Sequence, residues 1–289
     1  LTGNDNTVVG NESGSAVTSG ASNTALGSYA LRYTTTASNN TAIGKSALTN
    51  NSTGANNTAV GVNALPNNST ASSNTGVGYA ALQENTTGAS NTAVGSGALD
   101  ANTTASYNTA IGVDALGKNT TGTGNCAVGG FALEDNTTGD YNTALGRNAL
   151  TNNTTADNNT TIGYSAGSAI TTGTDNTLIG ANCGISATSD IGLTGMGKGA
   201  LQSSTGGYNT AIGVSALANI TGNHNVAIGR NTAAGLGASN YCVAIGDYAL
   251  DATSSADNNV AIGYNALTTC STGYENVAVG YLALEDTTT

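Results

Sequence analysis

Short apolar segments recur along the chain at a fixed interval and are separated by polar stretches. The recurring core is Asn-Thr-Ala-Ile/Val-Gly; after two further residues come Ala-Leu and then Asn-Thr-Thr-Gly. The glycine that closes the core steps by 17 residues from Gly10 to Gly197, by 16 to Gly213 and to Gly229, and by 17 to Gly280. The chain is therefore an array of 17 copies of a 17-residue unit, and such self-similarity indicates a repeat architecture.

Alternation within the core predicts which columns of the array face inward. The residue before the glycine is apolar in every copy, and the residue two places earlier is Thr, Cys126 or, in the last copies, Val. Since successive side chains of a strand point to opposite faces, we expect these two columns to point inward and the Ala between them to point outward. We interpret this Ala column as a flat subunit-contact surface: Ala25, Ala42, Ala59, Ala93, Ala110, Ala127 and Ala144.

The spacing predicts an all-β fold: a parallel β-solenoid or β-roll of about 17 coils, with 17 residues and two short strands per coil. Asn-Thr-Thr-Gly is typical of turns, and Asn51 to Asn153 at intervals of 17 are expected to form an amide ladder along one corner. We expect residues 1–289 to be a single array, part of a longer one. Its copies are irregular around 164–200 and 230–240, and Gly14, Gly167, Gly184 or Ala233 in place of Leu predicts thinner cores.

Composition narrows the possible functions. Only 8% of residues are charged, against roughly 25% in typical soluble proteins, and the net charge of −11 leaves no basic surface for nucleic acid. No apolar run approaches the roughly 20 residues of a membrane helix. The chain has one histidine, His224, and its four cysteines show no C-x-x-C spacing. We therefore expect no catalytic site, no metal and no cofactor, and His224 to be a surface residue.

The motif also carries a resemblance. Asn40-Thr41-Ala42-Ile43-Gly44 and Asn225-Val226-Ala227-Ile228-Gly229 resemble the head repeats of trimeric autotransporter adhesins of the YadA-like type. The longer N-T-A-I-G-x-x-A-L form resembles arrays in phage tail fibres and bacterial surface fibre proteins, and the resemblance spans the whole chain. It implies a β-roll of parallel chains, usually three, acting as a fibre, spike or adhesin on a cell surface or virion.

Tyrosines recur in two columns, one before the motif Asn and one after the motif Gly. Spaced aromatic rings can stack on sugars, so they are candidate glycan contacts, although rings in these columns can also cover neighbouring coils or a subunit seam. The candidates are Tyr79, Tyr107, Tyr141, Tyr164, Tyr208, Tyr241, Tyr264 and Tyr281.

Taken together, the sequence favours a structural or adhesive segment of an extracellular fibre. A coil that buries so few small side chains looks underfilled on its own, so we expect a homo-oligomer, a trimer by the resemblance, with a cell-surface glycan or protein as a further partner. The alternative is a monomeric ligand-binding solenoid that acts on ice or glycan. Ice binding requires a flat strand with two outward threonines per coil, as Thr-x-Thr, whereas the alternation predicts that the strand threonines are buried.

Overall fold

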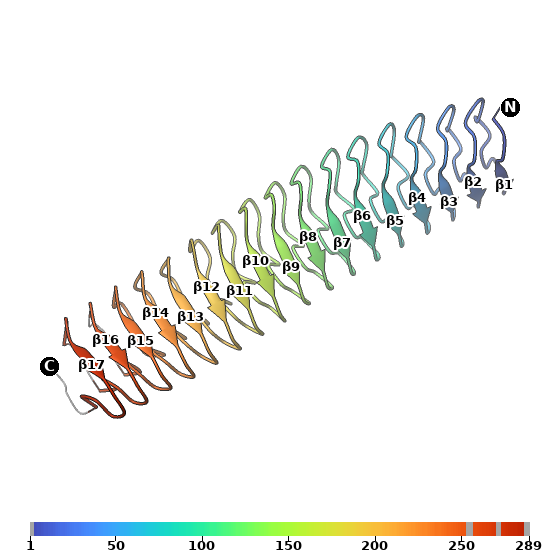
Figure 1. Ribbon diagram of the computed structural model, residues 1–289. Helices are drawn as coiled ribbons and strands as arrows, with labels where there is room; N and C mark the ends of the chain where they lie inside the picture. Colours follow the sequence, from blue (N-terminus) through green and yellow to red (C-terminus); the bar gives the residue numbers. More distant parts are fainter. Residues whose placement is uncertain (1–2, 253–256, 270–272, 286–289) are drawn as a thin grey trace. The chain divides into compact units, whose positions relative to one another are not determined.

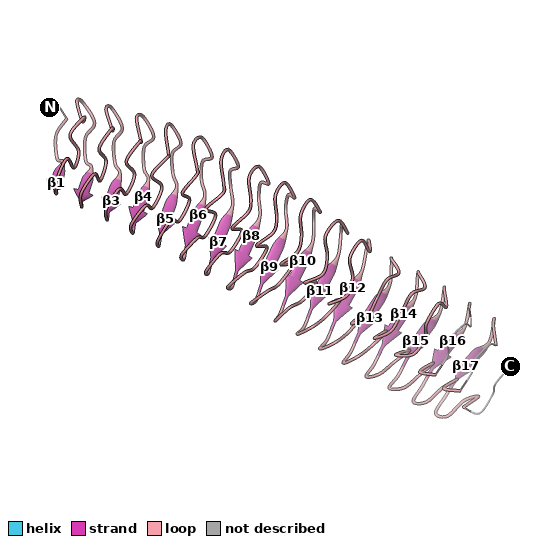
Figure 2. Ribbon diagram, turned by 180° about the vertical axis from the view of Figure 1, so that it is seen from behind, coloured by secondary structure: helices cyan, strands magenta, loops and turns pink. Residues whose placement is uncertain are grey.

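The computed structural model describes residues 3–252, 257–269 and 273–285. The chain divides into two compact units, Leu1–Asn142 and Thr143–Thr289. Each unit is a stack of similar coils, and the strands line one side of the stack while turns close the rest of each coil (Figures 1 and 2). Among the described residues there is no helix long and apolar enough to cross a membrane.

Each coil contributes one strand of three residues. The strands of the first unit are β1 Thr7–Val9, β2 Thr24–Leu26, β3 Thr41–Ile43, β4 Thr58–Val60, β5 Thr75–Val77, β6 Thr92–Val94, β7 Thr109–Ile111 and β8 Cys126–Val128. Those of the second unit are β9 Thr143–Leu145, β10 Thr160–Ile162, β11 Thr177–Ile179, β12 Thr194–Met196, β13 Thr210–Ile212, β14 Val226–Ile228, β15 Val243–Ile245, β16 Val260–Ile262 and β17 Val277–Val279.

Within each unit, every strand pairs in parallel with the strand one coil away, in register. Thr41 lies beside Thr58, Ala42 beside Ala59 and Ile43 beside Val60, and the register survives the two 16-residue steps, where Thr194 pairs with Thr210 and Thr210 with Val226. The predicted all-β parallel solenoid is confirmed. The identical spacing therefore stacks identical sequence positions into columns along each unit.

The second apolar segment of each copy is a turn, not the second strand that was predicted. Ser46 and Leu48 have φ values of 59° and 51°, in the left-handed region that strands do not use. The segment nevertheless bonds to the next coil, because the Leu48 N–H donates to the Ala64 carbonyl at 3.0 Å. The corner after the strand requires glycine, because a Cβ on Gly27, at φ 139°, would lie 2.5 Å from the carbonyl oxygen of Gly44.

The predicted direction of the strand side chains is wrong. The middle residue points inward and the two flanking residues point outward. The columns of Thr, Cys and Val and of Ile, Val and Leu that were expected inside are half-exposed or exposed. The Ala column that was expected to form the subunit contact is at most 1% exposed: Ala25, Ala42, Ala59, Ala93, Ala110, Ala127 and Ala144.

The reason is the small space inside the coil. The Leu of each Ala-Leu pair already fills the coil opposite the strand, and a Cβ added to Gly76, in the middle of β5, would lie 3.1 Å from the Leu65 Cδ1. Only a small side chain fits there. The larger Ile and Val side chains are therefore left on the outside, and a pattern based on hydrophobicity alone reverses the two faces.

Three of the four copies without Leu are not thinner in the core, contrary to expectation, because a larger strand residue compensates; the copy with Ala233 keeps the usual Ala227 in its strand. Leu178 stands in the middle of β11 where most copies have Ala, and its Cδ1 lies 2.6 Å from the position of a Cβ on Gly184. Thr161 and Val8 occupy the same space beside Gly167 and Gly14. In these copies a larger residue replaces the strand Ala, and Gly replaces the Leu. The total side-chain volume is thereby conserved, which is the kind of core change that proteins tolerate best.

Buried asparagines connect successive coils in two columns. The backbone N–H of Asn57 donates to the Asn40 Oδ1 at 2.9 Å, and the Asn57 Nδ2 donates to the Ala71 carbonyl at 2.9 Å. In the second column the Nδ2 of each Asn donates to the Oδ1 of the Asn one coil earlier, from Asn68 on Asn51 to Asn136 on Asn119. The predicted amide ladder is confirmed over Asn51 to Asn136.

Replacing Asn108 with Ala should strongly destabilise the first unit. The Asn108 Oδ1 accepts the Asn125 N–H at 2.9 Å and its Nδ2 donates to the Gly122 carbonyl at 2.9 Å, in a buried setting. Both partners would lose their bond, at roughly 1–3 kcal/mol each. Urea denaturation should show a clearly lower midpoint for Asn108→Ala than for the outward control Thr109→Ala. Equal midpoints would mean that the ladder does not stabilise the coil.

Candidate functional site

The outward face of the sheet is a repeated surface in both units. It carries two columns: Thr, Cys126 or Val at the first strand position, and Ile, Val, Leu or Met at the third. Several side chains of the third-position column expose more than a third of their surface, among them Leu26 (48%), Ile111 (40%), Leu145 (45%) and Met196 (46%). We call this surface the strand face.

The strand face bears no charge. None of the 23 charged residues of the chain (6 basic and 17 acidic) falls in either column of the 17 copies. At the first strand position, β14 to β17 carry Val226, Val243, Val260 and Val277 in place of threonine. The strand face is thus mixed hydroxyl and aliphatic in earlier coils and wholly aliphatic in the last four.

The eight candidate tyrosines are all exposed, at 44% to 75%, and lie along the two borders of the strand face instead of converging on one site. Along the border before the strand, Tyr208, His224 and Tyr241 stack with ring centroids 5.1 Å apart and interplanar angles of 2° and 3°. Along the other border, Tyr264 and Tyr281 stack at 5.5 Å. The rings of each stack face one another, so the ring faces inside a stack are not open to a sugar.

Single rings also lie against the neighbouring coil. A Cβ on Gly124 would lie 2.8 Å from the Tyr141 Cδ1, and a Cβ on Gly192 would lie 2.8 Å from the Tyr208 Cδ1. The ring arrangement therefore supports the interpretation of these columns as covers over neighbouring coils. His224 is exposed, as predicted, but its place between two rings was not foreseen from its lone occurrence.

No group of three or more His, Cys, Asp or Glu side chains within the described ranges could hold a metal ion. Cys126 is half-exposed in β8, whereas Cys183 is buried and its burial raises the pKa of the thiol to about 12. Cys242 is buried in the column of the motif asparagines, and its N–H donates to the Asn225 Oδ1 at 2.9 Å. Cys270, whose pairing with Cys242 the sequence left open, lies outside the described residues.

One carboxylate is held in an unusual setting. Asp190 occupies a turn column in which most copies have Gly or Ala, it is 8% exposed, and its Oδ2 is buried with no hydrogen-bond partner. Burial raises the pKa of this carboxyl above its ordinary value. Because its carbonyl still accepts the Asn176 Nδ2 at 2.8 Å, the backbone of the column is intact, and the missing hydrogen bond is confined to the side-chain Oδ2.

None of the protein-family models, curated proteins or solved structures compared with this chain matches it.

Replacing Asp190 with Ala should stabilise the second unit at pH 7 by about 1 kcal/mol, since an unpaired buried polar group is removed. The folded-state pKa of Asp190 is raised, so the folded protein binds a proton more readily than the unfolded chain does. The free energy by which Asp190 destabilises the fold therefore grows as the pH rises from the unfolded-state pKa through the folded-state pKa. Thermal unfolding should show the gain at pH 7 and a smaller one at pH 4. The exposed control Asp175→Asn should show neither; an unchanged midpoint for Asp190→Ala at pH 7 would refute the prediction.

Proposed function

We propose that this chain is a structural segment of an extracellular fibre or spike, and that copies of it associate in parallel through the strand face. One observation carries the proposal: the strand face is a long, uncharged, largely aliphatic surface on a chain of net charge −11. Contiguous exposed apolar surface of more than a few hundred Å² is typical of protein–protein contacts.

The distribution of charge favours a second copy of the chain as the occupant. Two chains of the same acidic protein repel one another at most surfaces, but at the strand face they can approach without burying a carboxylate, which would be costly. Completing the burial of one exposed Ile side chain contributes about 1 kcal/mol. Because the columns repeat at every coil within each unit, parallel copies can bring like columns together along the unit.

The resemblance to fibre and adhesin repeats agrees with this arrangement and supports three chains, at an extracellular or virion location. The proposed subunit contact is the strand face and not the Ala column, however, since the Ala column is buried inside each coil. We infer that length and regular display are the working properties of the segment, and that a cell-surface glycan or protein is its target.

The outward threonines support a second candidate function. Thr occupies the first strand position in twelve of the strands β1 to β13, Cys126 being the exception, so these coils present one outward Thr each, which is half of the Thr-x-Thr pair that an ice-binding solenoid needs. The four valines in β14 to β17 offer no hydroxyl to a water lattice. They favour protein contact over ice.

Light scattering coupled to size exclusion tests the first proposal. We expect a native mass that is a multiple of 28.1 kDa and persists on dilution. The triple variant Ile212→Glu, Ile228→Glu, Ile245→Glu places carboxylates on the strand face without touching the core. It should therefore be a monomer by light scattering and folded by circular dichroism. The control triple Val62→Glu, Val113→Glu, Val214→Glu lies beyond the strand glycine and should keep the wild-type mass.

A wild-type monomer at every concentration would overturn self-association. Thermal hysteresis of that monomer would then support the ice-binding alternative, and its absence would leave glycan binding by a monomer as the surviving one.

Cys126 offers an independent readout, because it lies on the strand face and Cys183 does not. In the assembly the Cys126 thiol should be covered, so it should react slowly with a thiol reagent at pH 8 in the wild type and much faster in the triple Glu variant. Cys183, buried and with its pKa raised to about 12, should be unreactive in both. Peptide mapping of the labelled cysteines gives the two rates separately; equal Cys126 rates would contradict contact through the strand face.

A further inference from the structure

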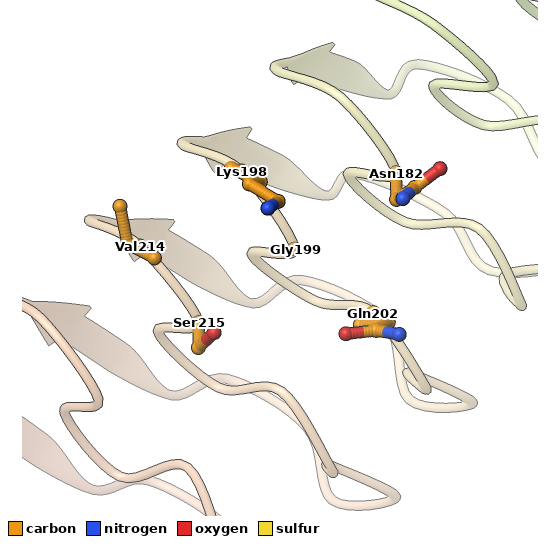
Figure 3. A pocket seen from close by; sticks show the side chains of 6 residues that line it. All are labelled: Asn182, Lys198, Gly199, Gln202, Val214 and Ser215. Atoms are coloured by element: carbon orange, nitrogen blue, oxygen red, sulfur yellow. The ribbon is translucent and has the colours of Figure 1, made fainter.

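A hollow of about 240 Å³ opens in the second unit among residues from three successive coils. It is lined by Asn182, Lys198, Gly199, Gln202, Val214 and Ser215. Figure 3 shows the Asn182, Lys198, Gln202 and Ser215 side chains around Gly199, which contributes only backbone. The hollow lies in one of the irregular stretches of the array, where the sequence pattern alone assigned no role.

The hollow exists because one column lacks a side chain at this coil. Asn182, Gly199 and Ser215 occupy the second position after the strand glycine in their coils, where most copies carry a side chain. A Cβ on Gly199 would lie 3.2 Å from the Gln202 Oε1 and 3.7 Å from the Ser215 Oγ. The other glycine of this column within the described residues, Gly97, is different, because the Asp114 carboxylate occupies the space beside it.

The polar groups around the hollow are suited to an anion that also carries hydroxyls. The Lys198 ammonium takes part in none of the ion pairs among the described residues, which use Arg32, Lys118 and Arg230. The amides of Asn182 and Gln202 and the Ser215 hydroxyl can each donate and accept hydrogen bonds. Asp190 is the one acidic residue between 176 and 216, so Lys198 gives this part of an otherwise acidic chain a local positive charge.

We propose that this hollow binds the carboxylate and neighbouring hydroxyls of a single acidic sugar unit, a uronic acid. Lys198 would pair with the carboxylate, while Gln202, Asn182 and Ser215 would bond the ring hydroxyls. The volume is below the roughly 300–1,000 Å³ of pockets that hold drug-sized ligands, which limits the ligand to about one ring. The site deepens the proposed fibre role by naming a glycan class, but it does not require assembly, because it lies beyond the strand glycine and outside the strand face.

Saturation-transfer NMR on the full chain tests the site, with glucuronate as the probe and glucose, acetate and inorganic phosphate as comparison ligands. A shallow site for one ring predicts a Kd for glucuronate on the order of 1 mM. Glucose, which lacks the carboxylate, and acetate, which lacks the hydroxyls, should each bind at least about tenfold more weakly, as expected for the loss of a charge-assisted contact or of several hydrogen bonds.

Two variants and two matched controls locate the binding. Lys198→Gln removes the charge, and Gly199→Asn fills the hollow with a residue that neighbouring coils already accept at this position and at positive φ, such as Asn182; each should abolish the signal. Lys45→Gln and Ser46→Asn make corresponding changes in the same columns of the first unit, where Lys45 stands beside Ser46, and should have no effect. Circular dichroism checks that each variant folds.

Three outcomes would overturn the proposal: no transfer at about 10 mM glucuronate, well above the expected Kd; a signal that survives Lys198→Gln; or equal binding of acetate or phosphate, which would make it a general anion site. Repeating the titration on the monomeric triple Glu variant separates this test from the fibre proposal. Binding there should match the wild type, whereas self-association is absent by design.

Discussion

The buried column of motif asparagines is the constraint on which most of each unit depends. A motif Asn accepts a backbone N–H from the next coil and donates to a carbonyl further along the chain, as Asn40 does with Asn57 and with Gly54, 14 residues away. A single side chain thereby satisfies two backbone groups that would otherwise be buried without partners. The requirement fixes where each motif Asn lies against the next coil, so the length of a coil can change only where these bonds are kept.

The two 16-residue steps show where that length can change. In the steps from Gly197 to Gly213 and from Gly213 to Gly229, the missing residue lies in the Thr-Thr turn, at Ser204-Thr205-Gly206 and Ile220-Thr221-Gly222. The amide bonds continue across the second step, where the Asn225 N–H still donates to the Asn209 Oδ1 at 2.9 Å. The turn is the adjustable part of the coil and the amide column is the rigid part.

Periodicity alone was enough to predict the repeat, the parallel solenoid and the amide ladder, because a fixed spacing stacks identical residues whatever the shape of the coil. It could not predict which face of a three-residue strand points inward. The hydrophobic pattern favoured Ile and Val for the core, but the Leu opposite leaves room only for a residue the size of Ala. Volume compensation among the copies could have predicted that the middle strand residue points inward, because Gly184 accompanies Leu178 and Gly167 accompanies Thr161.

The candidate sites depended on the same question of direction, so they were harder to predict. Once the Ala column is inside, the uncharged columns that remain outside become the proposed contact surface, and the 17 acidic residues are confined to other parts of the coil. The hollow at Gly199 could not be seen as a missing side chain until the columns were stacked in space, since Gly97 shares its column but is filled by Asp114. In such an array, a regular column builds the fold, and a departure from it in one coil is where a specific site can arise without disturbing the coils on either side.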